Sequence, residues 1–324
     1  MGCVLVAGAG GFIGGHLVKK LNDSKEVRIK AVDIKPLNLW HQIQNEVENI
    51  SLDLRDRGNC YSVMAGVDLV FNLAADMGGI GFIETHRAAC MLNVLINTHL
   101  LLAARDNDVK NYFFASSACV YNQSKQLDCA NPGLKESDAY PAMPEDGYGW
   151  EKLFSERMCR HFREDFGIDT KVFRFHNVYG PFGLFEGGRE KAPAAICRKV
   201  LVAKLSGEDR IEIWGDGNQT RSFIYVDDCI EGIIRLMKSD VVEPLNLGST
   251  ELVSINQLVE MVEDIAGLKL KKIYLPNEPN GVRGRNSDNE MIRNFLHWEP
   301  VIPLKIGLEK TYNWICNEMK IRHI

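Results

Sequence analysis

Short apolar runs alternate with amphipathic stretches through the first 176 residues. The apolar runs cover residues 3–7, 28–32, 49–54, 67–75, 112–115 and 172–175. Runs of this length are typical of strands that are buried on both faces of a parallel sheet. Several stretches between them carry apolar residues at helical spacing, for example Ile13, Leu17 and Leu21, and one long helix is expected over residues 83–105. This alternation predicts an α/β fold built on a Rossmann-type, doubly wound parallel sheet.

The pattern changes after residue 176. A glycine- and charge-rich loop is expected over residues 183–195, strands over 211–217 and 219–228, and helices over 228–238, 256–266 and 311–319. We predict two domains. Residues 1–176 form the first, to which residues 223–240 return, and residues 177–324 form a smaller C-terminal α/β domain that binds the substrate.

The composition limits the classes of function. The chain has 324 residues, 45% hydrophobic and 25% charged, with a net charge of −5, as is usual for a globular protein. The negative charge and the lack of a basic stripe argue against nucleic-acid binding. No apolar run is expected to span a membrane, and Met1 leads directly into a strand without a signal peptide.

The cysteines and histidines do not form a recognisable framework. The nine cysteines are an odd number without a Cys-x-x-Cys pair, which fits neither a disulfide scaffold nor a zinc site. The eight histidines are scattered without the spacing of metal ligands. We therefore expect reduced thiols, no metal and a cytoplasmic location.

A glycine-rich turn follows the first predicted strand and opens the first predicted helix. Gly8, Gly11 and Gly14 have the spacing of a dinucleotide-binding fingerprint. Glycines there let the backbone turn tightly and approach a pyrophosphate at the helix N-terminus. The next strand ends at Asp33, whose carboxylate suits the adenosine ribose hydroxyls and repels a 2′-phosphate. The motif predicts NAD as the cofactor, a preference that the nearby Lys35 weakens.

Further cofactor contacts are expected where other parallel strands end, because ligands collect at the carboxyl ends of such strands. Asp53 ends the third apolar run, and small residues end the fourth. The predicted cofactor-binding residues are Gly8, Gly11, Phe12, Ile13, Gly14, Asp33, Asp53, Leu54, Leu73, Ala74, Ala75, Tyr148 and Lys152. Asp33 also fits an ordinary turn residue at the end of a strand.

Tyr148 and Lys152 stand four residues apart, before apolar residues at helical spacing. In the first turn of a helix both side chains share one face. A free phenol has a pKa of about 10, and a nearby ammonium group lowers that pKa. The pair is predicted to take a proton from an alcohol while a hydride leaves its carbon, with Ser116 or Ser117 at a strand end as a third partner. Alone, the spacing also fits a solvated helix face.

Together these motifs resemble the extended short-chain dehydrogenase/reductase superfamily, which acts mostly on nucleotide sugars. The resemblance covers essentially the whole chain and includes residues 214–221 (Trp-Gly-Asp-Gly-x-Gln-x-Arg). Within the superfamily, the chain is similar to the GDP-mannose 3,5-epimerase family. This similarity rests on blocks in the same order at residues 72–82, 116–119, 187–194, 219–223 and 281–288. Plant members carry extra residues at both ends that this chain lacks.

The resemblance implies NAD-dependent epimerisation of a GDP-sugar at C3 and C5 through a transient 4-keto intermediate, of the GDP-mannose to GDP-L-galactose type. It implies that Tyr148 takes the C4 hydroxyl proton, that Ser117 bonds the C4 oxygen, and that Lys152 holds the tyrosine and the nicotinamide ribose. A 4-ketone acidifies both neighbouring carbons, so inversion needs a base on one face of the ring and an acid on the other. The resemblance supplies Cys119 as the thiolate base and Lys191 as the acid.

The resemblance also implies an NAD site in the first domain and a nucleotide-sugar site in the second. The implied substrate-binding residues are Gly78, Ser117, Ala118, Cys119, Asn177, Glu190, Lys191, Ala192, Lys199, Gln219, Arg221 and Arg285. Arg221 and Arg285 are expected to hold the pyrophosphate, because a guanidinium group binds phosphate in a bidentate manner. Arg283 is an alternative for that role, and Lys199 is a weaker candidate.

Structural alternatives exist for these residues. Cys119 fits a small buried hydrophobe, Lys191 a surface lysine, Asn177 a strand-end turn, Gly78 a flexible loop, and the arginines solvated surface positions. A homodimer is also expected, with a four-helix contact made by residues 83–105 and 148–166.

Other functions stay open at this point. The first is another GDP- or NDP-sugar epimerase or a 4,6-dehydratase of the same superfamily. Dehydratases carry a carboxylate pair after the serine strand end, where this chain has Ala118 and Cys119. A 3,5-epimerase for a 6-deoxy or heptose GDP-sugar is a close variant. A non-catalytic NAD-binding sensor is a third possibility, although such proteins lack the tyrosine–lysine pair.

Overall fold

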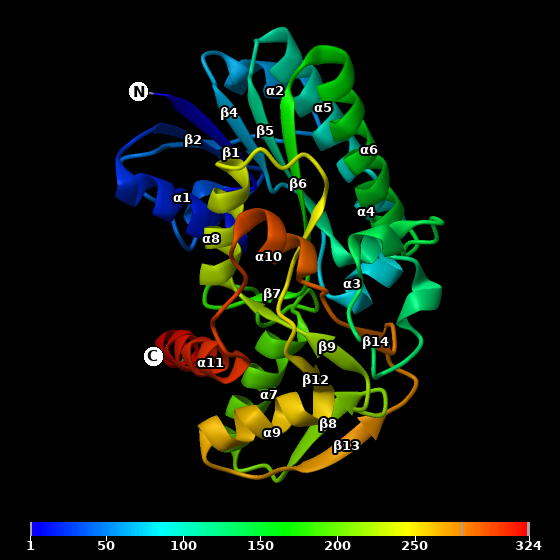
Figure 1. The fold of residues 1–324 in the computed structure, drawn as a ribbon. Helices are drawn as coiled ribbons and strands as arrows, with labels where there is room; N and C mark the ends of the chain where they lie inside the picture. The colour runs from blue at the N-terminus through cyan, green and yellow to red at the C-terminus, as the bar shows by residue number, and fades with distance from the viewer. Residues whose placement is uncertain (1, 280, 323–324) are drawn as a thin grey trace.

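The computed structural model describes residues 2–279 and 281–322 and is centred on a seven-stranded parallel sheet (Figure 1). The strands lie in the order β3 (Glu48–Ser51), β2 (Arg28–Asp33), β1 (Cys3–Ala7), β4 (Leu69–Asn72), β5 (Asn111–Ser117), β6 (Asp169–Phe175) and β11 (Leu245–Leu247). Every neighbouring pair is parallel. The strand order reverses between β1 and β4, which is where such sheets bind ligands. The predicted doubly wound α/β fold is confirmed.

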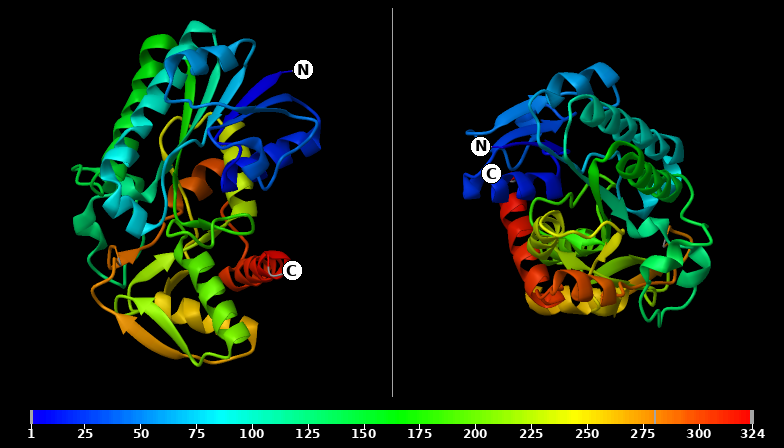
Figure 2. Two further views of the ribbon diagram at one scale, coloured as in Figure 1. Left: turned by 180° about the vertical axis from the view of Figure 1, so that it is seen from behind. Right: turned by 45° about the horizontal axis from the view of Figure 1, so that its top comes forward.

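Helices cover both faces of this sheet because each buries an apolar stripe against it. α2 (Arg57–Met64), α5 (Asn93–Asp106) and α6 (Tyr148–Phe166) pack together on one face. α1 (Phe12–Ser24) and α8 (Val226–Met237) pack together on the other. Figures 1 and 2 show the two layers on either side of the strands.

The single helix expected over residues 83–105 is wrong. The chain forms three helices instead, α3 (Ile80–Thr85), α4 (Arg87–Met91) and α5. His86 leaves the helical conformation, with φ −124° and ψ 40°. The side-chain amide of Asn93 bonds the backbone of Asp76 twice. Its oxygen accepts from the Asp76 N–H (2.7 Å), and its nitrogen donates to the Asp76 carbonyl (3.1 Å). The breaks therefore fold the loop after β4 back over the end of the sheet.

The expectation that no segment reaches membrane-spanning length was also wrong. Residues Arg87–Asp106 run for 20 residues and contain an 18-residue window with a mean hydropathy of 1.3, which is enough to cross a membrane by length and composition alone. In the structure 44% of that window is buried inside the protein, and α5 packs on α2 and α6. These contacts are those of a helix that covers a sheet.

The C-terminal part lies below the carboxyl end of the sheet in Figure 1. Its helices are α7 (Ala192–Ser206), α9 (Ile255–Ala266), α10 (Glu290–Leu296) and α11 (Leu304–Arg322). Its strand pairs and small sheets are β7 (Val178–Tyr179) with β10 (Ile224–Tyr225), β8 (Arg210–Trp214) with β13 (Lys271–Leu275), and β9 (Thr220–Ser222) with β12 (Leu252–Ser254) and β14 (Gly284–Arg285). Short 3₁₀ turns lie at Leu37–Leu39, Ala118–Val120, Gln123–Gln126 and Glu136–Ala139.

The chain crosses between the two parts more than once. α8 packs on α1, and β11 pairs with β6 at the edge of the main sheet. The returning segment thus extends beyond the predicted 223–240. One set of contacting buried side chains also runs from Val4 in β1 to Ile315 in α11. The division at residue 176 stays a prediction, since the core is continuous across it.

A buried ion pair ties α6 to the sheet. Two nitrogens of Arg174 on β6 donate to the carboxylate of Glu156 on α6, at 3.0 and 2.8 Å. The Ser116 hydroxyl at the end of β5 donates to the same carboxylate at 2.5 Å. Both charged side chains are almost fully buried, at 3% and 4% exposure. These contacts fix the middle of α6 against β6 and the end of β5.

We predict that Glu156→Ala lowers the free energy of unfolding by about 3–5 kcal/mol, because it leaves a buried guanidinium without its carboxylate. Glu164→Ala is the matched control, since Glu164 lies on the same helix and pairs with Arg160 at the surface. This control is expected to change stability little. Denaturant unfolding of both variants measures the difference, and equal stabilities would show that the buried pair contributes nothing.

Candidate active site

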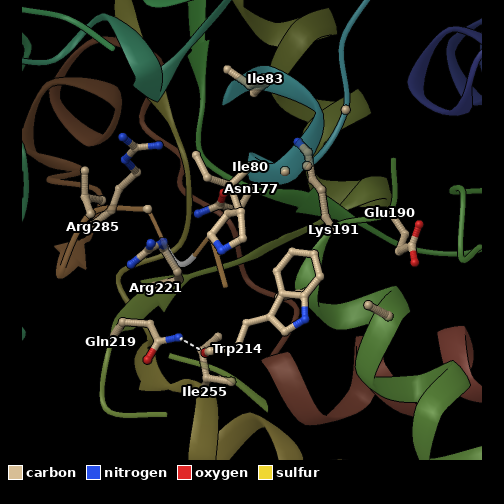
Figure 3. Close-up of a pocket in the computed structure, with 18 of the residues that line it drawn as sticks. Ile80, Ile83, Asn177, Glu190, Lys191, Trp214, Gln219, Arg221, Ile255 and Arg285 are labelled. Carbon is tan, nitrogen blue, oxygen red and sulfur yellow. Dashed lines mark hydrogen bonds between the residues drawn. The ribbon is translucent and has the colours of Figure 1, made fainter. Parts of the chain in front are cut away.

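A cavity of about 320 Å³ lies between the carboxyl end of the sheet and the C-terminal part. Its walls come from the loop after β4, the turn after β5, the start of α7, and the strands β8, β9 and β14. Every residue predicted to bind the substrate lines this cavity. Figure 3 shows Arg221 and Arg285 on one side of it and Glu190 on the other, with Trp214 between them.

Tyr148 and Lys152 lie in the first turn of α6, as the spacing predicted. The Lys152 ammonium nitrogen lies 5.6 Å from the centre of the Tyr148 ring and 4.6 Å from that of Phe114. Both side chains are buried, and Ser117 ends the neighbouring strand β5. The structure therefore brings the predicted tyrosine, lysine and serine to one place.

Burial governs the protonation of Tyr148. Burial raises the pKa of the phenol well above its ordinary value, and only the hydrogen bond with Ser117 works in the opposite direction. Burial outweighs that hydrogen bond because the ring lies among the buried side chains of Phe82, Ile83 and Cys90. The expectation that Lys152 favours the phenolate stays a prediction.

Cys119 lies in the 3₁₀ turn that follows β5 and is buried. Its backbone N–H donates to the Ser117 hydroxyl oxygen at 3.2 Å. The pKa of its thiol is raised to about 12, first by burial and then by the Glu145 carboxylate, while the Arg285 guanidinium works in the opposite direction. The expected thiolate therefore depends on positive charge close to the sulfur.

Lys191 caps α7 and faces the same cavity. Its loop is held against the loop after β4, because the Gly79 N–H donates to the Arg189 carbonyl at 3.0 Å and Arg189 forms an ion pair with Asp76 at 2.6 Å. A side chain on Gly79 would come within 2.4 Å of the Glu190 carbonyl oxygen. Burial lowers the pKa of the Lys191 ammonium group, so this lysine transfers its proton more readily than a surface lysine does.

The three candidate arginines have different surroundings. Arg285 donates to Gln126 at 2.6 Å and to Glu145 at 2.8 Å, and it points its third nitrogen at the Cys119 sulfur. These contacts hold the Arg285 guanidinium at the thiol end of the cavity, and its role at the pyrophosphate stays a prediction. Arg283 lies outside the cavity lining and binds Asp216 with two nitrogens at 3.0 and 3.1 Å.

Arg221 is the other arginine predicted to hold the pyrophosphate. It pairs in register with Arg285 across β9 and β14. Burial lowers the pKa of Arg221 to about 10, and the neighbouring positive charge of Arg285 adds to this shift. An anion beside the two guanidinium groups would relieve their mutual repulsion.

The remaining predicted substrate residues line the wall of the cavity. Lys199 donates to the Glu212 carbonyl at 2.9 Å, with its ammonium 5.9 Å from the Trp214 ring centre. The Gln219 amide donates to the Trp214 carbonyl at 2.8 Å, and the Asn177 amide to the Ser222 carbonyl at 3.0 Å. These hydrogen bonds join neighbouring segments of the cavity lining. The lining also contains the small residues Gly78, Ala118 and Ala192.

The glycine turn forms a cradle that fits a dinucleotide. Gly8 has a φ of 86°, and a side chain there would meet the Leu73 carbonyl carbon at 2.8 Å. A side chain on Gly14 would lie 2.1 Å from the Gly8 carbonyl oxygen. Gly11 caps α1 without any side-chain hydrogen bond, which leaves the first N–H groups of the helix for a phosphate. Phe12 and Ile13 form the first turn of this helix, and Leu73, Ala74 and Ala75 follow β4.

The two predicted acidic contacts of the cofactor differ in exposure. Asp33 ends β2, is buried, and accepts the Lys35 backbone N–H at 3.0 Å. The Lys35 ammonium group donates to the Gly10 carbonyl at 3.1 Å. Asp53 follows the edge strand β3, is more exposed, and forms an ion pair with Arg55 at 2.7 Å. The adjacent Leu54 packs into the core, so only its backbone is available to a ligand.

The sequence prediction missed residues that the fold brings into the site. Glu145 and Trp214 line the cavity. Gln126 lies outside the lining and accepts a hydrogen bond from Arg285. Glu145 stands three residues before Tyr148 in the chain. Its nearness to the tyrosine was a signal, but a carboxylate in a proline-containing loop has no helical or strand pattern that marks it as buried.

Comparison with known proteins places this chain among relatives. The sequence profile described as NAD dependent epimerase/dehydratase family matches residues 4–248. The chain is 48% identical over 324 residues to GDP-mannose 3,5-epimerase of Arabidopsis thaliana, covering 98% of this chain and 83% of the relative. The chain belongs to the NAD dependent epimerase/dehydratase family. NAD dependence of the family agrees with the glycine cradle and with Asp33.

Solved structures of nucleotide-sugar enzymes share the fold over the whole length. The UDP-glucose 4-epimerase of Thermotoga maritima superposes with a TM-score of 0.87 at 24% identity, covering 98% of this chain and 99% of its own. MoeE5, solved in complex with UDP-glucuronic acid and NAD, superposes with a TM-score of 0.81 at 29% identity, covering 98% and 100%. The family fold therefore includes both the sheet and the C-terminal part.

We predict that Tyr148→Phe lowers turnover by about a hundredfold or more, because it removes the only hydroxyl of that ring and with it a positioned proton acceptor. Binding of NAD and sugar is expected to stay largely intact, since one oxygen contributes little to affinity in the ground state. Tyr61→Phe is the control, because its hydroxyl binds Asp106 at the surface. Turnover assays with calorimetric binding measure both effects, and wild-type turnover in Tyr148→Phe would mean that another group serves the alcohol.

Proposed function

We propose that this protein is an NAD-dependent isomerase that epimerises a GDP-sugar at C3 and C5 through a transient 4-keto intermediate, of the GDP-mannose to GDP-L-galactose type. The observation that carries the proposal is the pairing of Cys119 and Lys191. These two titratable groups come from different elements and line one cavity together with Ser117, beside which Tyr148 is buried. The similarity to GDP-mannose 3,5-epimerase supports the choice of sugar and base.

The residues that would hold NAD are the glycine turn, the first turn of α1 and Asp33. Bound NAD supplies the acceptor that takes a hydride from C4 and gives it back to the same carbon, so none is consumed. Tyr148 takes the proton from the C4 hydroxyl, and Ser117 bonds the C4 oxygen. Lys152 keeps positive charge beside the phenol and so favours the phenolate when the proton leaves.

The ketone at C4 makes the protons on C3 and C5 acidic, because each carbanion delocalises as an enolate. Inversion then requires one group that removes a proton and a second that returns one from the opposite face. Cys119 removes the proton in its thiolate form, and Lys191 returns one as an ammonium group. A simple 4-epimerase needs neither group.

A 4,6-dehydratase is a weaker candidate. Such an enzyme needs a carboxylic acid to protonate the leaving hydroxyl. Glu145 is the carboxylate paired with Arg285 at the cavity. Burial alone would raise the pKa of this carboxyl, but Arg285, Cys119 and Arg221 together offset burial and hold the pKa below its usual range. Glu145 therefore stays ionised and does not supply a proton.

The experiment that tests the proposed function is incubation of the protein with a panel of GDP- and UDP-sugars in deuterated water. Epimerisation at C3 and C5 places deuterium on those carbons, whereas 4-epimerisation and reduction do not. Mass spectrometry and proton NMR of the recovered sugars identify the labelled carbon. Loss of the C6 hydroxyl would identify a dehydratase, and no labelling of any GDP-sugar would rule the proposal out.

We predict that Cys119→Ala still oxidises C4 but loses exchange of the C3 and C5 protons by about a hundredfold or more, the size of effect that a positioned base contributes. Tyr148, Lys152 and Ser117 are unchanged in this variant. The measurement is deuterium incorporated per NADH formed. Cys197→Ala is the control, because Cys197 is fully buried in α7. An unchanged ratio in Cys119→Ala would mean that this thiol only fills space.

We also propose a homodimer that buries α5 and α6 against a second copy. Met91, Leu92 and Leu95 are 49%, 48% and 36% exposed, and Trp150 and Phe154 on α6 are 45% and 55% exposed. α5 and α6 pack side by side, so these side chains gather apolar surface on one side of the protein. Members of the superfamily commonly pair through these helices.

We predict that the wild type is a dimer at micromolar concentration by light scattering and that Phe154→Glu shifts it toward the monomer. The carboxylate would be buried without a partner in the contact, which disfavours association. Phe295→Glu is the control, since Phe295 is 52% exposed on α10, away from these helices. A monomeric wild type would exclude this assembly.

A further inference from the structure

The guanidinium group of Arg285 is held in one orientation by two acceptors. Its Nε donates to Gln126 Oε1 at 2.6 Å, and its Nη2 donates to Glu145 Oε1 at 2.8 Å. These bonds leave Nη1 facing the Cys119 sulfur at 3.7 Å. Because a guanidinium is planar and rigid, fixing two of its nitrogens determines where the third one points.

Glu145 is joined to Cys119 as well as to Arg285. The backbone N–H of Glu145 donates to the Cys119 carbonyl at 3.0 Å. The side chains of Glu145 and Arg285 are only 10% and 7% exposed. A side-chain hydrogen bond with Cys119 also helps to lower the pKa of the Glu145 carboxyl. The pair and the thiol thus form one contiguous buried group.

Stability alone does not account for this arrangement. Removing two charges from water costs free energy that their attraction often fails to recover, and a buried pair can be replaced by apolar residues without loss of stability. A buried ion pair at the wall of a cavity that contains a candidate base therefore indicates a role in the chemistry.

We propose that Glu145 is a positioning residue for the proton transfers at C3 and C5: its carboxylate, together with Gln126, aims the Arg285 guanidinium at the Cys119 sulfur, where the positive charge stabilises the thiolate. This inference rests on the proposed function, because that function assigns the proton transfer to Cys119. Glu145 was not among the residues predicted from the sequence, and this proposal adds it to the site. Glu145 acts through Arg285 and exchanges no proton itself.

Glu145 has two opposing effects on the thiol. Its oxygen aims Arg285, which favours the thiolate, while its own negative charge disfavours it. The other charged or titratable groups around Cys119 are Tyr148, Lys191 and Arg221. Of these three, Arg221 also interacts with the Glu145 charge, so the variants below compare loss of the charge with loss of the oxygen.

Two variants separate these effects. Glu145→Gln keeps an oxygen for Arg285 but removes the charge, so the pH profile of C3 and C5 exchange is expected to move to lower pH by about one unit. Glu145→Ala removes the oxygen that aims Arg285. It is expected to lower deuterium incorporation per NADH formed by roughly tenfold or more, the size of one charge-assisted hydrogen bond, while oxidation of C4 continues.

A second measurement needs no sugar. The rate of alkylation of Cys119 by iodoacetamide, followed by mass spectrometry of its peptide across a pH series, reports the thiolate fraction directly. Glu145→Gln is expected to move this profile to lower pH by the same amount. Cys129, which is more exposed, serves as the reference thiol in each sample.

The control is Glu299→Gln, which makes the same substitution in an exposed pair with Arg293 and is expected to match the wild type in both measurements. Unchanged pH profiles in Glu145→Gln, or equal losses of oxidation and exchange in Glu145→Ala, would overturn the proposal. If Glu145→Ala does not fold, Gln126→Ala removes the other acceptor and is expected to lower the same ratio; an unchanged ratio would again overturn it.

Different results contradict the proposed function and the role of Glu145. A wild type that places no deuterium on C3 or C5 of any GDP-sugar contradicts the proposed function, and the alkylation profile of Glu145→Gln then decides the role of Glu145 by itself. A wild type that exchanges these protons normally, with an unchanged profile in Glu145→Gln, contradicts only the role of Glu145.

Discussion

The buried pair of Arg174 and Glu156 fixes the geometry on which the site depends. It joins β6 to α6 and, through the Ser116 hydroxyl, to the end of β5. Ser117 and Tyr148 therefore meet because the strand and the helix that carry them are locked together. The guanidinium of Arg174 also donates to the Tyr121 hydroxyl at 3.3 Å, which extends the polar contacts under the floor of the cavity.

These contacts continue into the C-terminal part of the chain. The Tyr121 hydroxyl donates to Asn246, whose amide in turn donates to the carbonyls of Leu134 and Asp288 at 2.7 and 3.1 Å. The segment that carries Arg285 is thus fastened to the same buried groups that fix α6. The family profile matches residues 4–248, and Arg285 lies beyond the matched residues.

Burial governs the chemistry of the cavity more than residue type does. It raises the pKa of Tyr148 and Cys119 and lowers that of Lys191. Each of the three groups is thereby pushed toward its neutral form. Whether Cys119 acts as a base depends on the guanidinium that lies against it, and the position of that guanidinium depends on Glu145 and Gln126.

The sequence by itself determined the parts that follow from local pattern. The apolar runs gave the parallel sheet, the glycine spacing gave the cofactor turn, and Tyr148 with Lys152 shared a helix face because they stand one turn apart. Only the tertiary structure decided that the long helix is interrupted at His86 and Leu92, that Arg285 lies against Cys119, and that Glu145 is buried beside it. Those facts depend on contacts between residues far apart in the chain, such as Arg285 with Glu145 and Gln126. Spacing along a sequence predicts which side chains share a strand or a helix, but it carries no information on which distant loops meet.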